Sequence, residues 1–194
     1  IFIFNVSNPE NPVFLGKIDN ADDVQSGLSA VAVDGKYAYV ATARAISADP
    51  AFGQLQIIDI SNPLSSTVVY TLNLSGIVGT SGQGIGNSIF YKDGFVYLGL
   101  TQVGSGSTDG EFNIIDVHNF PTNQPVLADS YTVDNAVNAI YVKGGYAYLA
   151  TPNSQELIVL DVSSPNDIST GSPIPWGYDA AGSGNGKSLY LVGD

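Results

Sequence analysis

Two short acidic segments hold the side chains best suited to bind a cation. Asp19, Asp22 and Asp23 lie within five residues of one another, and Asp109 and Glu111 flank a glycine. Ca²⁺ prefers oxygen ligands and takes about six to eight of them. Neither segment has the D-x-[DN]-x-[DN]-G spacing of a calcium loop. We therefore expect either solvated surface charge or a Ca²⁺ site at one of the two segments, and no other cofactor.

Few side chains could carry out catalysis. The chain has no Cys, and His118 and Arg44 are its only His and Arg. The chain therefore has few residues from which a Ser-His-Asp triad or a His-based metal site could be formed. A carboxylate pair could hydrolyse a glycosidic bond, but the Glu residues lie in different segments and no Asp pair stands out. We expect no catalytic residue, with a glycan hydrolase as a remote alternative.

Trp176, the sole Trp, is the candidate for binding a sugar ring, because it stands two residues before Tyr178. An exposed pair of aromatic rings can stack on a sugar, whereas a buried pair fills the gap between neighbouring sheets. Both interpretations stay open at the level of the sequence.

One acidic position recurs along the chain. Asp59 ends the apolar run of the segment Leu55-Gln56-Ile57-Ile58-Asp59-Ile60-Ser61-Asn62-Pro63, and weaker copies occupy residues 1–9, 112–120 and 157–165. A short apolar run between turn signals is typical of a strand buried on both faces. The equivalent residues are Asn5, Asp116 and Asp161. Since every copy has this residue, we expect its side chain to accept N–H groups of the following turn rather than to bind a ligand.

A second repeated element is a glycine turn followed by a strand with a fixed Tyr. It occupies residues 34–42, 92–100, 143–151 and 186–193, and places Tyr39, Tyr97, Tyr148 and Tyr190 at equivalent positions. Asp-Gly and Gly-Gly between apolar runs are hairpin signals. Units of roughly 50 residues with four strands each are typical of propeller blades.

The two elements together predict an all-β, single-domain β-propeller over residues 1–194. The expected repeats are a half blade at 1–27, blades at 28–85, 86–135 and 136–179, and a half blade at 180–194. The last half blade would begin with an inner strand at 178–183. The two half blades would either join in a four-bladed ring or end an arc of a larger propeller.

The segment Leu55–Pro63, preceded by Gly35-Lys36-Tyr37-Ala38-Tyr39-Val40-Ala41, resembles the LVIVD-repeat family of β-propeller proteins. The resemblance extends over essentially the whole chain. It implies a propeller fold and a location in exported or surface-anchored prokaryotic proteins. It implies no catalytic residue.

The composition limits the kinds of partner that the chain is expected to bind. A net charge of -12 argues against nucleic acid and anionic membranes, which attract basic patches. No apolar stretch is long enough to span a membrane. Few Lys, no Cys and many Ser, Thr, Asn and Gly residues favour an extracellular or cell-surface location. Because the chain contains no Met, even at position 1, we expect a fragment or a processed product.

These observations predict a non-enzymatic module of an exported or cell-surface protein that serves adhesion, assembly or scaffolding. The alternative is a propeller that holds Ca²⁺ or a glycan on its acidic loop face. Expected partners are other protein chains or cell-surface glycans. In an open ring, strands near Ile1 and Val192 would have unpaired edges and could join copies into an oligomer or filament.

Overall fold

The computed structural model describes residues 1–18, 27–42, 53–79, 82–152, 155–168, 176–182 and 184–192. Every regular element in these ranges is a strand, which confirms the all-β prediction, and none of them contains a helix that could span a membrane. The strands are β1 Phe2–Asn5, β2 Val13–Lys17, β3 Leu28–Asp34, β4 Tyr37–Thr42, β5 Leu55–Asp59, β6 Thr67–Leu72, β7 Gly86–Lys92, β8 Phe95–Leu100, β9 Phe112–Asp116, β10 Val126–Tyr131, β11 Ala139–Lys143, β12 Tyr146–Ala150, β13 Leu157–Asp161 and β14 Trp176–Tyr178.

Three four-stranded antiparallel sheets form the body of the protein, each with its strands in chain order. We call them the first blade (β3–β6), the second blade (β7–β10) and the third blade (β11–β14). A two-stranded sheet, the β1–β2 hairpin, precedes them. This arrangement confirms the expected propeller blades.

The first two strands of each blade are joined by the expected tight turns. In the second blade the turn residues Asp93 and Gly94 have φ values of 49° and 80°. Two successive positive φ values match the right-handed twist of the strands, and Gly or Asp adopts them at low cost. The turn thereby fixes the register in which Tyr97 pairs with Phe90.

The first and second blades are apolar on both faces, and their two middle strands are covered from both sides. We call the side that meets the following blade the forward face and the opposite side the rear face. In the first blade, Tyr39 and Ile57 pair across β4 and β5 and lie on the forward face, whereas Ala38 and Ile58 lie on the rear face. All four are buried. Alternation along a strand assigns successive residues to opposite faces.

The cores lie between consecutive blades. Between the first and second blades, Leu55 and Ile57 pack against Val96, Leu98 and Ile115. There, Tyr39 stacks on Tyr91 with ring centroids 5.2 Å apart, and burial raises the pKa of Tyr39 to about 12. The phenol therefore stays neutral and acts as a packing group.

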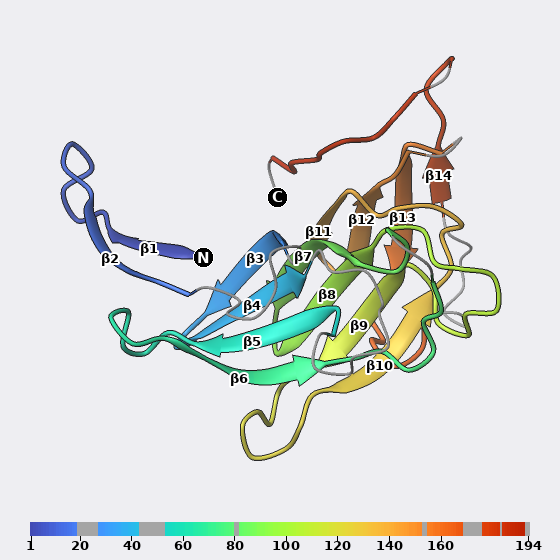
Figure 1. The fold of residues 1–194 in the computed structure, drawn as a ribbon. Helices are drawn as coiled ribbons and strands as arrows, with labels where there is room; N and C mark the ends of the chain where they lie inside the picture. Colours follow the sequence, from blue (N-terminus) through green and yellow to red (C-terminus); the bar gives the residue numbers. More distant parts are fainter. Residues whose placement is uncertain are drawn as a thin grey trace.

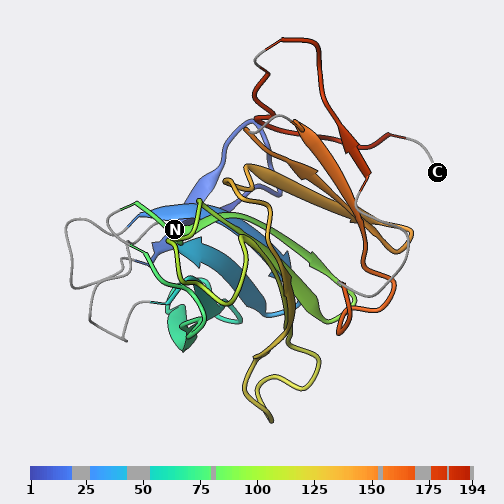
Figure 2. The same cartoon turned by 90° about the vertical axis from the view of Figure 1, so that its right-hand side faces the viewer.

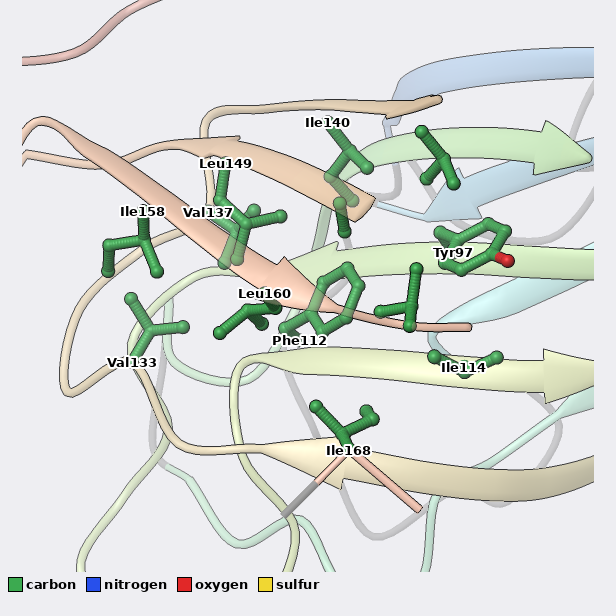
Figure 3. Close-up of a cluster of buried hydrophobic side chains, with 13 residues drawn as sticks. Tyr97, Phe112, Ile114, Val133, Val137, Ile140, Leu149, Ile158, Leu160 and Ile168 are labelled. Atoms are coloured by element: carbon green, nitrogen blue, oxygen red, sulfur yellow. The ribbon is translucent and has the colours of Figure 1, made fainter. Parts of the chain in front are cut away.

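Figure 3 shows the corresponding core between the second and third blades. Tyr97, Phe112 and Ile114 of the second blade face Leu149 and Leu160 of the third. Each interface thus uses the forward face of one blade and the rear face of the next.

The blades fan around their inner strands, since β3, β7 and β11 lie next to one another (Figure 2). The described sheets do not close into a ring, so the four-bladed ring is not formed. The β1–β2 hairpin and β14 lie on opposite sides of the molecule (Figure 1). The arrangement is an open arc of blades.

The prediction for the last unit is wrong in its register. Residues 176–178 form β14, the fourth strand of the third blade, and not the start of an inner strand at 178–183. Residues 184–192 form no strand. Tyr190 is 81% exposed and its ring lies 6.4 Å from that of Tyr141, a residue of the inner strand β11. Tyr190 is therefore not the equivalent of Tyr39 and Tyr97.

Tyr97→Ala should lower the free energy of unfolding by about 3 kcal/mol or more, because it removes a large aromatic side chain from the core between two blades. Tyr190→Ala is the matched control and should change it by no more than about 0.5 kcal/mol, since the side chain is exposed. Chemical denaturation followed by circular dichroism measures both. Equal effects of the two substitutions would contradict the packing described here.

Candidate functional site

The repeated acidic position accepts hydrogen bonds from the turn that follows it, as predicted. The Oδ1 atom of Asp59 accepts the N–H of Ser61 at 2.8 Å, and Asp161 accepts that of Ser163 at 2.9 Å. Asn5 does the same with Ser7 at 2.9 Å. The side chain therefore ends each strand by satisfying a backbone donor, whether it is a carboxylate or an amide.

These bonds favour the charged form of the carboxylates. The hydroxyl and N–H of Ser61 hold the pKa of Asp59 below its usual value, and Ser163 has the same effect on the pKa of Asp161. In the second blade the N–H of His118 and its ring lower the pKa of Asp116. An acid-base catalyst at neutral pH needs a pKa shifted the opposite way.

Glu111 is a buried clamp for two loops. Its Oε1 accepts the N–H of Val103 at 3.1 Å, and its Oε2 accepts those of Val133 and Asp134 at 2.9 and 3.1 Å. The side chain is 1% exposed. Both carboxylate oxygens are thus directed at backbone amides rather than at solvent.

The same clamp recurs at the residue that precedes the third strand of each blade. In the first blade, Gln54 Oε1 accepts the N–H of Leu74 at 2.9 Å, and in the third, Glu156 Oε2 accepts that of Ala180 at 2.8 Å. In each case the acceptor holds the segment that leads out of the fourth strand. Sequence reasoning missed this role, although a Gln or Glu stands at the same place in all three copies.

Two of the long loops are in contact. The N–H groups of Gly104 and Thr108 donate to the carbonyls of Val78 and Gly76 at 2.7 and 2.8 Å. Asp109 lies in this contact, where its carboxylate occupies the space that a side chain at position 76 would need. Asp109 and Glu111 are thus near in sequence but placed differently, one against a neighbouring loop and one inside.

Within the described ranges, no three His, Asp or Glu side chains come close enough together to hold a metal ion. Asp19, Asp22 and Asp23, the other predicted segment, lie outside the described residues. A Ca²⁺ site therefore stays a prediction for both segments.

His118 belongs to the turn after β9. Its Nδ1 lies 2.9 Å from Asp116 Oδ1, and its ring meets the edge of Phe95 with centroids 4.6 Å apart. The ring also fills the space beside Gly94. These contacts give His118 a structural place in the turn.

Trp176 and Tyr178 form an exposed aromatic pair on β14. Their rings are stacked, with centroids 6.4 Å apart and planes 28° apart, and the residues are 58% and 54% exposed. Trp176 is opposite Val159 and Tyr178 opposite Leu157, so the pair continues an apolar row on the forward face of the third blade. Among the described residues, no other blade packs on this face.

A pocket of about 200 Å³ lies at the turn between β9 and β10. It is smaller than the roughly 300–1,000 Å³ of typical small-molecule sites. Its lining consists of Asp116, Val117, Asn119, Phe120, Asn123, Gln124 and Val126. We assign it no role, since Asp116 is already bonded to the turn.

Comparison with known proteins supports the fold. A family model described as LVIVD repeat matches residues 28–73 and 136–170, which include most of the first and third blades. No curated protein matches the chain. The crystal structure of the computationally designed Ika4 protein is similar with a TM-score of 0.54, at 16% identity, over 89% of this chain and 84% of that one. At this identity the similarity shows the fold alone.

The turn carboxylates predict a loss of stability in acid. A carboxylate whose pKa is lower in the folded than in the unfolded protein stabilises the fold at pH values above its unfolded pKa of about 3.9. This contribution is lost as the pH falls through the folded pKa. The melting temperature of the variant D59N/D116N/D161N should therefore fall less than that of wild type when the pH is lowered from about 5 to about 2.5. Asn5 shows that an amide keeps the bond.

Melting curves recorded across this range measure the difference. The control D59A/D116A/D161A lacks the acceptor and should be less stable than the Asn variant at every pH. Parallel pH profiles for wild type and the Asn variant would contradict the assignment.

Glu111→Ala should destabilise the protein by about 1–3 kcal/mol, the cost of removing the acceptor of one buried N–H group, that of Val133, with a smaller contribution from the partly buried N–H groups of Val103 and Asp134. Glu111→Gln should cost less, because one carbonyl oxygen is kept, as at Gln54. Denaturant titration should give the order wild type, Gln, Ala. If Ala were as stable as Gln, the clamp would not have the role assigned to it.

Proposed function

We propose that this chain, which carries LVIVD repeats in a β-propeller arrangement, is a non-catalytic module for adhesion, assembly or scaffolding. One observation carries the proposal: the side chains that recur in every blade and could do chemistry are bonded to the protein's own backbone. Asp59, Asp116 and Asp161 hold turns, and Glu111 holds loops. The recurring polar groups therefore serve the fold, which leaves surfaces and loops to carry binding.

We further propose that the module belongs to an exported or cell-surface protein and binds other protein chains or surface glycans there. The absence of Cys, the few Lys residues and the net charge of -12 support this location. The acidic charge also supports partners other than nucleic acid.

A glycan is the second candidate partner, and the exposed Trp176–Tyr178 pair favours it. Stacked, flat aromatic rings are a surface on which sugar rings can lie. Ca²⁺ at Asp109 and Glu111 has less support, because both oxygens of Glu111 accept backbone N–H groups.

Addition of Ca²⁺ should therefore give the same binding heat and the same change in melting temperature for wild type and for Asp109→Asn, since any response would come from Asp19, Asp22 and Asp23, which lie outside the described residues. Isothermal titration calorimetry and thermal unfolding measure these effects. A rise that Asp109→Asn abolishes would establish the metal site instead.

A glycan array tests the second candidate, and Trp176→Ala should abolish any genuine hit while leaving the melting temperature unchanged. Catalysis would require turnover of a glycan substrate that a single Asp→Asn change removes without loss of stability. That result would overturn the non-catalytic proposal.

A further inference from the structure

The segment Asn73-Leu74-Ser75 follows the fourth strand of the first blade and has the sequence pattern of an acceptor for N-linked glycans. In this pattern, N-x-[ST] with x other than Pro, an oligosaccharide is attached to the Asn in a surface segment of a secreted protein. The pattern occurs twice in the chain, here and at Asn5-Val6-Ser7. Since the pattern alone does not distinguish the two segments, their local structures have to.

The clamp before the third strand of the blade sets the direction of the three side chains. Gln54 Oε1 accepts the N–H of Leu74 at 2.9 Å, and Leu74 is 3% exposed. Successive side chains of an extended segment point to opposite sides. Asn73 and Ser75 therefore both point outward, and both are exposed. The acceptor amide and the hydroxyl of the pattern thus lie on the same, accessible side.

The second blade shows that this arrangement belongs to the repeat. There Glu111 accepts the N–H of Val133 at 2.9 Å, and Val133 is 4% exposed, while Thr132 and Asp134 on either side of it are exposed. Thr132 occupies the position that Asn73 has in the first blade. The blade architecture therefore exposes this position, and the first blade places the acceptor pattern on it.

The backbone around Asn73 is held without help from the Asn73 side chain. Gly53 lies against the peptide group that precedes Asn73, since a side chain at position 53 would overlap the carbonyl of Leu72. The carbonyl of Leu74 accepts the N–H of Ile77 at 3.2 Å. Within the described part of the chain, the Asn73 amide has no hydrogen-bond partner. A sugar on its Nδ2 atom would therefore replace no existing bond.

Asn5, in the other copy of the pattern, is placed differently. Its Oδ1 accepts the N–H of Ser7 at 2.9 Å, which is the bond that Asp59 and Asp161 make at the same position of their turns. The Asn5 amide is thus held along its own turn instead of projecting from it. We expect Asn5 to be the poorer acceptor.

We propose that Asn73 is a site of N-linked glycosylation. The donor is an oligosaccharide linked through phosphate to a lipid. A bond forms between Asn73 Nδ2 and the anomeric carbon of the first sugar, and the bond from that carbon to the phosphate oxygen breaks. The amide nitrogen loses one proton, and the lipid phosphate leaves. The inference rests on the exported or cell-surface location proposed above, because acceptors of this pattern are used in secreted proteins.

The acceptor lies beside the contact between two long loops. Gly76, the residue after Ser75, accepts the N–H groups of Thr108 and Asp109 at 2.8 and 3.3 Å. A glycan at Asn73 would project next to these joined loops of the first and second blades. Because it is bulky and hydrophilic, it would limit which partners can reach this part of the surface.

Trypsin separates the two copies of the pattern, because it cleaves after Lys and Arg. Asn73 falls in the peptide 45–92, and Asn5 in the peptide that ends at Lys17. In the protein isolated from the cells that produce it, we expect peptide 45–92 to be heavier than its sequence by a set of sugar residues. Fragmentation in the mass spectrometer should place them on Asn73. The peptide that ends at Lys17 should have the mass of its sequence.

Substitutions made in the same cells test the role of each side chain. Asn73→Gln and Ser75→Ala should each abolish the added mass, the first by removing the acceptor and the second by removing the hydroxyl. Ser75→Thr should keep it, since the pattern accepts either hydroxyl residue. Asn5→Gln is the matched control and should leave it unchanged. The circular dichroism spectra of the variants at positions 73 and 75 should match wild type, because both side chains are exposed.

An unmodified peptide 45–92 in protein that is exported would overturn the inference and leave the proposed location and function standing. Added mass that persists in Asn73→Gln, or that lies on Asn5 instead, would also overturn it. Fractionation of the cells distinguishes the remaining case. Protein that stays in the cytoplasm without the glycan would overturn the proposed location together with the inference.

Discussion

Burial of both faces of the first and second blades is the constraint on which the structure depends. The middle strands of a blade, such as β8 and β9, carry apolar side chains on both sides, and Val96, Leu98, Phe112 and Ile114 are all fully buried. A four-stranded sheet of this kind cannot exclude water from both faces by itself. It needs one neighbour in front and one behind, so the stability of each blade comes from its interfaces as much as from its own strands.

The polar residues follow from the same constraint. A strand buried on both faces must end abruptly, and the backbone donors at its ends need acceptors. Asp116 provides one after the strand, through the N–H of His118, and Glu111 provides others before it, through Val103 and Val133. Acidic side chains of this kind suggest catalysis or metal binding when only the sequence is known. In this structure they instead hold the backbone at the ends of strands.

Sequence patterns predicted the features that depend only on residues close together in the chain. The Asx turn at Asp59 involves residues only two apart, and the turn at Gly94 is set by φ preferences, so both could be predicted. The last unit could not, because a Tyr suits an inner strand, as Tyr141 does, as well as a second strand. The contact that settles its register joins Gly186 to Thr151, far apart in the sequence. The clamp at Glu111 also depends on distant loops that only the fold brings near.

The outermost faces of the described arc differ from the faces between blades. Phe2, Phe4 and Phe14 on the β1–β2 hairpin and Trp176 and Tyr178 on β14 are all substantially exposed. Tyr39 and Tyr97, which lie between blades, are 3% and 4% exposed. The same alternation of residues along a strand therefore gives a buried or an exposed aromatic side chain, according to whether a neighbouring blade packs on that face.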